Sequence, residues 1–167
     1  KTFTEEDVFL HNEIWSSFDA HSDLNELEQE DIIDSLNAKI QVFRNHISEA
    51  SHLILTFGTA WVYRHLEKNQ WVANCHKVPQ QQFLKELLTV TQCQEAMASI
   101  EKGIRSLNPN IQIIYTLSPV RHIKDGYVEN QRSKAHLMAA LHQHLDQSVE
   151  NNYYFPSFEL VMDELRD

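Results

Sequence analysis

Two short apolar runs, each ended by a residue that stops a strand, constrain the fold of this chain more than any other feature. The first is Leu53 to Phe57, which stops at Gly58, and the second is Ile111 to Leu117, which stops at Ser118-Pro119. Runs of this length with such flanks are typical of buried strands. Because helix-period segments separate them, the order of elements predicts a parallel sheet covered by helices.

The segments around these runs carry the helical period. Apolar residues recur every three or four positions from Ile32 to Ile47, and a second long helix is expected around Leu137 to Leu145. Phe83 to Leu88 is predicted to form a short helix after a proline, and Thr91 is expected to cap the helix that follows. The predicted inner face of that helix comprises Ala96, Ile100, Ile104 and Leu107.

Shorter segments complete the expected element order. Trp61 to Leu66 and Gln70 to Asn74 are predicted to form a β-hairpin, and Tyr153 to Pro156 a third strand end with a helix starting near Ser157. The stretch from Trp15 to Ser22 has no clear period and is expected to be loop or irregular strand. Helices and strands therefore alternate along one domain, residues 1–167.

Composition and charge exclude several classes of function. The net charge of −10 repels phosphate backbones, so nucleic acid is not an expected partner. No apolar run approaches the roughly 18 to 20 residues that span a bilayer, so no membrane insertion is expected. The first 18 residues lack the pattern of a signal peptide, which favours the cytoplasm. Cys75 and Cys93 are expected to be free thiols, with a single bridge as the alternative.

Ligands of open α/β sheets bind beyond the carboxyl ends of the strands. This rule selects the segments Gly58 to Trp61 and Ser118 to Arg121 as the expected site. Blocks of sequence at and around these strand ends resemble the GSCFA family. They read LTFGTAWVY from Leu55, VANCHKVP from Val72, LSPVRHIKDG from Leu117, ENQRSKA from Glu129, YFPSFE from Tyr154 and, upstream, DAHS from Asp19.

The resemblance implies a fold and a chemistry. The GSCFA family is grouped with the SGNH hydrolases, which implies an α/β fold, a three-layer α/β/α sandwich around a flavodoxin-like parallel sheet. The implied reaction is hydrolysis of an acyl ester by a serine that a histidine activates. The family's serine would lie in a GSCFA motif and its histidine in an Asp-x-x-His block, and neither occurs here. The chain is therefore expected to be the truncated central part of the domain, inactive on its own.

The resemblance also implies site residues. Those expected to form the oxyanion side of the site are Gly58, Thr59, Asn74 and His76. Those expected to bind substrate are His21, Trp61, Ser118, Arg121, Asn130 and Lys134. Hydrolases of the clan place an asparagine two residues after the glycine at this strand end, but this chain has Ala60, so Asn74 is the candidate oxyanion donor.

Each of these residues also has a purely structural interpretation. Gly58 could simply end a strand, His21 could be a surface histidine, and Arg121 and Lys134 could balance an acidic surface. Cys75 beside His76 is poorly placed as a nucleophile, because neighbours on a strand face opposite ways. No set of histidine, cysteine and acidic residues has the spacing of a metal site, so neither metal nor cofactor is expected.

Two hypotheses about function remain open. The first is an esterase that acts on a small-molecule or glycan ester, such as an acylated sugar. The second is a catalytically inactive hydrolase fold used for binding or assembly. The oligomeric state is open in both.

Overall fold

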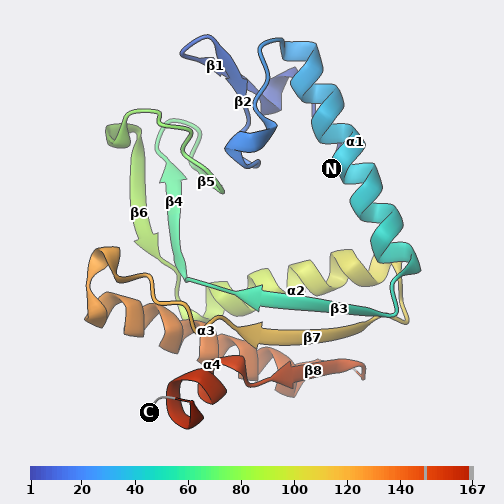
Figure 1. Cartoon of the computed structure of the whole chain (residues 1–167), viewed down its shortest axis with the longest axis vertical. Helices are drawn as coiled ribbons and strands as arrows, with labels where there is room; N and C mark the ends of the chain where they lie inside the picture. The colour runs from blue at the N-terminus through green and yellow to red at the C-terminus, as the bar shows by residue number, and fades with distance from the viewer. Residues whose placement is uncertain (149, 166–167) are drawn as a thin grey trace. The chain divides into compact units, whose positions relative to one another are not determined.

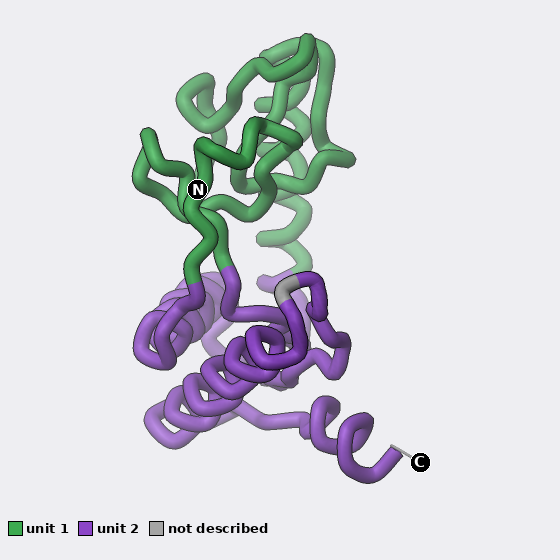
Figure 2. The backbone as a smooth tube through the Cα atoms, turned by 90° about the vertical axis from the view of Figure 1, so that its left-hand side faces the viewer, with its two compact units in different colours: residues 1–46, 62–86 green, residues 47–61, 87–167 purple. Residues whose placement is uncertain are grey.

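The computed structural model describes residues 1–148 and 150–165, and the chain divides into two compact units. Unit 1 comprises Lys1–His46 and Val62–Glu86, and unit 2 comprises Ile47–Trp61 and Leu87–Asp167 (Figure 2). Each unit has its own apolar clusters and is described separately.

Unit 2 is built on a parallel sheet of three strands. These are β3 (His52–Phe57), β7 (Gln112–Leu117) and β8 (Asn152–Phe155), in the order β3-β7-β8. Figure 1 shows their arrowheads at the same end of the sheet. The parallel pairing of the two apolar runs, and the third strand near Tyr153, are therefore confirmed.

Helices pack on this sheet. The longest are α2 (Val90–Leu107) and α3 (Tyr127–Gln147), and β8 leads into the short α4 (Ser157–Glu159) and a π-helical turn, η5 (Leu160–Glu164). Ile113, Tyr115 and Leu117 alternate along β7, so they share one face of the sheet, where they join the core cluster with residues of both long helices. The α/β class with a parallel sheet flanked by helices is confirmed, in agreement with a flavodoxin-like sandwich.

Unit 1 holds two small antiparallel arrangements. A hairpin pairs β1 (Phe9–His11) with β2 (Ile14–Ser16). Of the stretch from Trp15 to Ser22, which was expected to be loop or irregular strand, only Trp15 and Ser16 belong to this hairpin. Its turn residues, Asn12 and Glu13, both have positive φ. The sheet β5-β4-β6 contains β4 (Trp61–His65) and β5 (Gln70–Val72), the predicted hairpin. Helix α1 (Gln29–Glu49) confirms the first long amphipathic segment.

Short 3-10 turns connect these elements. They are η1 (Glu5–Asp7), η2 (Ser22–Leu24), η3 (Gln80–Gln82) and η4 (Ile123–Asp125). Unit 1 has two apolar clusters, one around Phe3, Ile32 and Leu36 and one around Phe18, Val72 and Phe83.

Two predicted details are wrong. Phe83–Leu87 is a strand, β6, and not the start of a short helix. β6 is hydrogen-bonded to β4. Such pairing with another strand overrides the weak helical spacing of the apolar residues in this segment.

The second error concerns α2, which begins two residues earlier than predicted. Its N-cap is Thr89, not Thr91. Its buried face is also rotated from the predicted one, because Ile100 is 41% exposed. The residues that α2 buries are Cys93, Met97, Glu101 and Ile104.

Candidate functional site

The carboxyl ends of β3 and β7 lie side by side in unit 2. Phe57 and Leu117 are register partners, and the Ser118 amide donates to the Phe57 carbonyl oxygen at 2.9 Å. Gly58 and Ser118, which follow the two strands, are thus brought together at one edge of the sheet. This edge is the position where open α/β sheets bind ligands.

A buried lysine ties the two strand ends together. Lys134, on α3, is only 2% exposed, and its Nζ donates to the carbonyl oxygens of Gly58 and Ser118, each at 2.6 Å. No carboxylate pairs with it among the described residues. Burial lowers the pKa of the Lys134 ammonium below its ordinary value. Lys134, which was predicted from the sequence to bind substrate, therefore contacts backbone carbonyl oxygens at the predicted site.

The preceding helical residue, Ser133, fixes the chain just beyond β3. Its Oγ accepts from the Ala60 amide at 2.7 Å and hydrogen-bonds Thr59 Oγ1 at 3.0 Å. Thr59 Oγ1 in turn accepts from the Trp61 amide at 3.1 Å, and the Trp61 indole donates to the Glu129 carbonyl oxygen at 3.3 Å. Thr59 and Trp61 are thus held against the amino-terminal half of α3.

A cleft of about 390 Å³ lies beside this edge, within unit 2. Arg121 and Asn130 both line it, together with side chains of the C-terminal turn such as Phe158 and Met162. Asn130 is buried, and its Oδ1 accepts from the His122 amide at 2.8 Å, which shapes the loop after β7. Arg121 is exposed, and its guanidinium Nη2 lies 3.9 Å from the Met162 sulfur. The structure therefore brings two of the predicted substrate-binding residues to one cleft.

Asn74 and His76 belong to unit 1, on the chain that leaves β5. His76 and Lys77 have φ of 48° and 60°, a left-handed conformation that residues other than glycine adopt infrequently. The turn is closed by the His76 amide, which donates to Asn74 Oδ1 at 3.0 Å. His76 is 9% exposed, and its Nε2 lies 2.7 Å from the Ser17 carbonyl oxygen and 3.1 Å from that of Ala20.

His21 also lies in unit 1, but its contacts are local. It is the N-cap of η2, where its Nδ1 accepts from the Asp23 amide at 3.2 Å, and its side chain is 71% exposed. Because the three unit 1 residues and the unit 2 residues belong to different units, their convergence on one site stays a prediction.

The two cysteines are free thiols, as expected. Burial raises the pKa of both Cys75 and Cys93 above the ordinary value. A raised pKa leaves less thiolate at neutral pH, and the thiolate is the nucleophilic form. The environment of Cys75 therefore does not activate it for catalysis.

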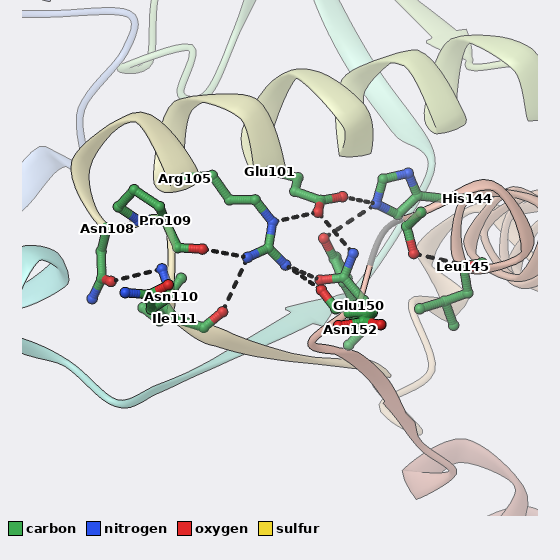
Figure 3. Close-up of polar contacts among 12 residues, drawn as sticks. Glu101, Arg105, Asn108, Pro109, Asn110, Ile111, His144, Leu145, Glu150 and Asn152 are labelled. Carbon is green, nitrogen blue, oxygen red and sulfur yellow. Dashed lines mark hydrogen bonds and ion pairs between the residues drawn. The ribbon is translucent and has the colours of Figure 1, made fainter.

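A second polar cluster, which sequence reasoning missed, lies at the amino ends of the strands in unit 2 (Figure 3). Glu101 on α2 accepts from Arg105 Nε at 2.6 Å and lies 2.9 Å from His144 Nε2 on α3. Asn152, at the start of β8, donates to the same carboxylate at 2.8 Å. Burial alone would raise the pKa of Glu101, but the hydrogen bonds from Arg105 and Asn152 outweigh it and hold the pKa below its usual range.

This cluster joins four elements. The Arg105 guanidinium also donates to the Ile111 carbonyl oxygen at 3.2 Å, and His144 Nε2 lies 3.2 Å from the Tyr115 hydroxyl. The one sequence signal for it was the i, i+4 spacing of Glu101 and Arg105. It lies at the opposite end of the strands from Gly58 and Ser118, where its contacts connect α2, α3, β7 and β8.

Over residues 1–148 and 150–165, no three histidine, cysteine or acidic side chains lie close enough together to hold a metal ion. Within the same residues, none of the helices has the length and apolar character required to cross a bilayer.

Comparison with known proteins gave one match. The model of the GSCFA family matches residues 1–167, which is the whole chain. No curated protein and no solved structure matches. The family match agrees with the sequence blocks at the two strand ends, and the chain belongs to the GSCFA family.

Proposed function

We propose that this chain forms the substrate-binding side of a serine ester hydrolase that acts on a small-molecule or glycan ester, such as an acylated sugar. Membership of the GSCFA family, which is grouped with the SGNH hydrolases, suggests a hydrolase-like function. The observation that carries the proposal is the joined carboxyl edge of β3 and β7, with Lys134 bonded to both strand ends. Such an edge is where ligands of α/β sheets bind.

The reaction assigns distinct roles to residues of this chain. A serine attacks the ester carbonyl, a histidine takes its proton, and hydrogen-bond donors stabilise the oxyanion that forms. Residues 1–167 contain neither a Gly-Ser-Cys nor a Gly-Asp-Ser sequence. We therefore place the serine and the histidine that activates it outside these residues. Asn74 supplies an oxyanion donor through its amide nitrogen, since its Oδ1 already accepts from His76. Arg121, exposed in its cleft, contacts polar groups of the substrate.

One observation favours the alternative, an inactive binding module. At the strand end where hydrolases of the clan carry an asparagine, this chain has Ala60, and the Ala60 amide already donates to Ser133 at 2.7 Å. Neither the side chain nor the backbone amide of this residue is then free to stabilise an oxyanion.

The two functions are separated by testing the complete reading frame and residues 1–167 in parallel. The complete protein is expected to react with a serine-directed fluorophosphonate probe and to hydrolyse an aryl acetate. The 167-residue chain is expected to do neither, because both steps require the nucleophile. Inertness of the complete protein toward the probe and toward a panel of acetylated sugars would support the binding module instead.

The oxyanion role of Asn74 has its own test in the complete protein. Asn74→Ala is expected to lower kcat by about 10²- to 10³-fold, the usual cost of removing one oxyanion donor. Asn110→Ala, in an exposed turn of unit 2, is the matched control and should leave kcat unchanged. An unchanged kcat in Asn74→Ala would remove this residue from the mechanism.

A further inference from the structure

The peptide group that joins Gly58 to Thr59 has a buried cation at its carbonyl end. Lys134 Nζ donates to the Gly58 carbonyl oxygen at 2.6 Å, and the Lys134 side chain is buried. This peptide is trans, so its N–H points away from its C=O and hence away from the ammonium. A cation at one end of a peptide group polarises it and strengthens the donor at the other end. The Thr59 amide is therefore a polarised hydrogen-bond donor at the carboxyl edge of the sheet.

The Thr59 amide is also available, unlike the two amides that follow it. The Ala60 amide donates to Ser133 Oγ at 2.7 Å, and the Trp61 amide donates to Thr59 Oγ1 at 3.1 Å. Within the described residues, the hydrogen bonds of Thr59 are made by Oγ1, and its amide has no acceptor. Thr59 is exposed, so a ligand at this edge reaches it from solvent.

A second donor lies against Gly58. A Cβ at this position would lie 3.4 Å from His122 Nε2, so the imidazole packs directly on the glycine. Asn130 holds the His122 backbone in place, because its Oδ1 accepts from the His122 amide at 2.8 Å. His122 is exposed, and its side chain makes no hydrogen bond within the part of the chain that the structure describes. Its Nε2 is therefore available to carry a donor hydrogen, in the neutral ring or in the imidazolium.

The spacing of the two donors selects the ligand. Backbone bond lengths place the Thr59 nitrogen within about 4 Å of the position that a Cβ of Gly58 would occupy. The nitrogen is then at most about 7 Å from His122 Nε2, which lies 3.4 Å from the same position. A carboxylate spans such a distance, because each of its two oxygens accepts a hydrogen bond of about 2.9 Å.

The charge of the edge also favours an anion. No carboxylate pairs with Lys134 among the described residues, so its charge attracts a negative group that binds at the Thr59 amide. We propose that the Thr59 amide and the His122 imidazole bind a carboxylate group at the carboxyl edge of the sheet. The choice of a carboxylate rests on the proposed function, since hydrolysis of an ester releases a carboxylic acid that is ionised at neutral pH. The positions of the two donors do not depend on that function.

The test follows the amide and imidazole ¹⁵N resonances of the 167-residue chain during titration with sodium acetate. Acetamide, which has the shape of acetate without its charge, and sodium chloride at equal ionic strength are the comparison probes. Acetate should shift the Thr59 amide and His122 Nε2. The amides of Ala60 and Trp61 should shift less, because they already donate within the protein. Neither comparison probe should reproduce the pattern.

Two variants and a matched control locate the carboxylate. His122→Leu removes the imidazole donor and should raise the Kd of acetate about three- to tenfold, the value of one hydrogen bond. Gly58→Ala places a methyl group against His122 Nε2 and should also raise this Kd. The φ of Gly58 is not positive, so alanine adopts its backbone conformation. Gly103→Ala is the control and should leave Kd unchanged, because its added methyl group meets no atom within 4 Å.

Three outcomes would overturn the proposal. The first is that acetate shifts the Thr59 and His122 resonances no more than sodium chloride does, and the second is that acetamide shifts them equally. The third is a Kd that is equal in His122→Leu, Gly58→Ala and the unmodified chain. The first two are read on the unmodified chain and do not depend on the folding of a variant. Failure of the proposed hydrolysis would look different, as a complete protein that binds acetate at Thr59 but leaves the aryl acetate and the fluorophosphonate probe unreacted.

Discussion

Replacing Glu101 by glutamine tests whether the buried cluster of Glu101, Arg105 and His144 stabilises unit 2. The side chains of Glu101 and Arg105 are only 10% and 17% exposed. Glutamine keeps the shape and one acceptor oxygen but removes the negative charge that faces the guanidinium. Breaking a buried ion pair by removing one partner typically costs about 3–5 kcal/mol.

The expected cost here is smaller than that range. Arg105 keeps other acceptors, which are the carbonyl oxygens of Pro109, Ile111 and Glu150 and the side chain of Asn152. Its charge is therefore partly compensated after the substitution, and we expect a loss of about 2–3 kcal/mol of unfolding free energy. For a chain of this length, such a loss lowers Tm by about 4–12 °C.

The assay combines urea unfolding with hydrogen exchange. Exchange of the β7 amides reports unit 2 separately from unit 1, and it should accelerate in Glu101→Gln. Glu95→Gln makes the same charge change on an exposed position of α2 and should alter stability by no more than about 0.5 kcal/mol. Equal stability of the two variants would refute the reasoning.

The effect of Glu101→Gln should also depend on pH. The folded protein holds the pKa of Glu101 below the ordinary value of 4.5. A carboxyl with a depressed folded pKa contributes stability that is present above its unfolded pKa and lost as pH falls through the folded one. The stability difference between Glu101→Gln and the unmodified chain should therefore be full at pH 7 and shrink below about pH 4.5. A difference that grows toward acid would contradict the assigned pKa shift.

Three further outcomes follow from individual contacts. Ser133→Ala leaves the buried Ala60 amide without its acceptor and should cost about 1–3 kcal/mol in urea unfolding. Thr89→Ala removes the N-cap of α2 and should cost about 1 kcal/mol in the same assay, whereas Thr91→Ala should be nearly neutral. Cys75, its thiol pKa raised by burial, should react with iodoacetamide at pH 7 more slowly than an unstructured cysteine peptide, as measured by mass spectrometry.

The strands of unit 2 were predictable because their signal is local. An apolar run with a strand-ending residue after it indicates a buried strand without knowledge of its partners. The strand β6 was not predictable in this way, because Phe83 and Leu87 are also spaced as on a helix. What decides its conformation is pairing with β4, a contact between segments that the local pattern does not encode.

The face of α2 was mispredicted for a related reason. Apolar periodicity favoured the face with Ile100, but the buried face contains Glu101. A carboxylate is rarely buried unless it is paired, so a sequence pattern assigns it to the surface. Its partner Arg105 was visible four residues along the same helix, but His144 lies on another helix. Only the structure shows that the carboxylate is satisfied inside the protein.

The contacts of Ser133 and Lys134 with the loop after β3 could not be predicted from the sequence motif alone. Neighbouring residues on a helix point about 100° apart, so the motif alone does not indicate that both side chains serve one loop. In the structure Ser133 reaches the Ala60 amide with a short side chain, and Lys134 reaches the Gly58 carbonyl oxygen with a long one. The difference in length compensates for the difference in direction. It follows that α3 sets the path of the chain beyond β3, and that substitutions on this helix would act on the candidate site through the backbone.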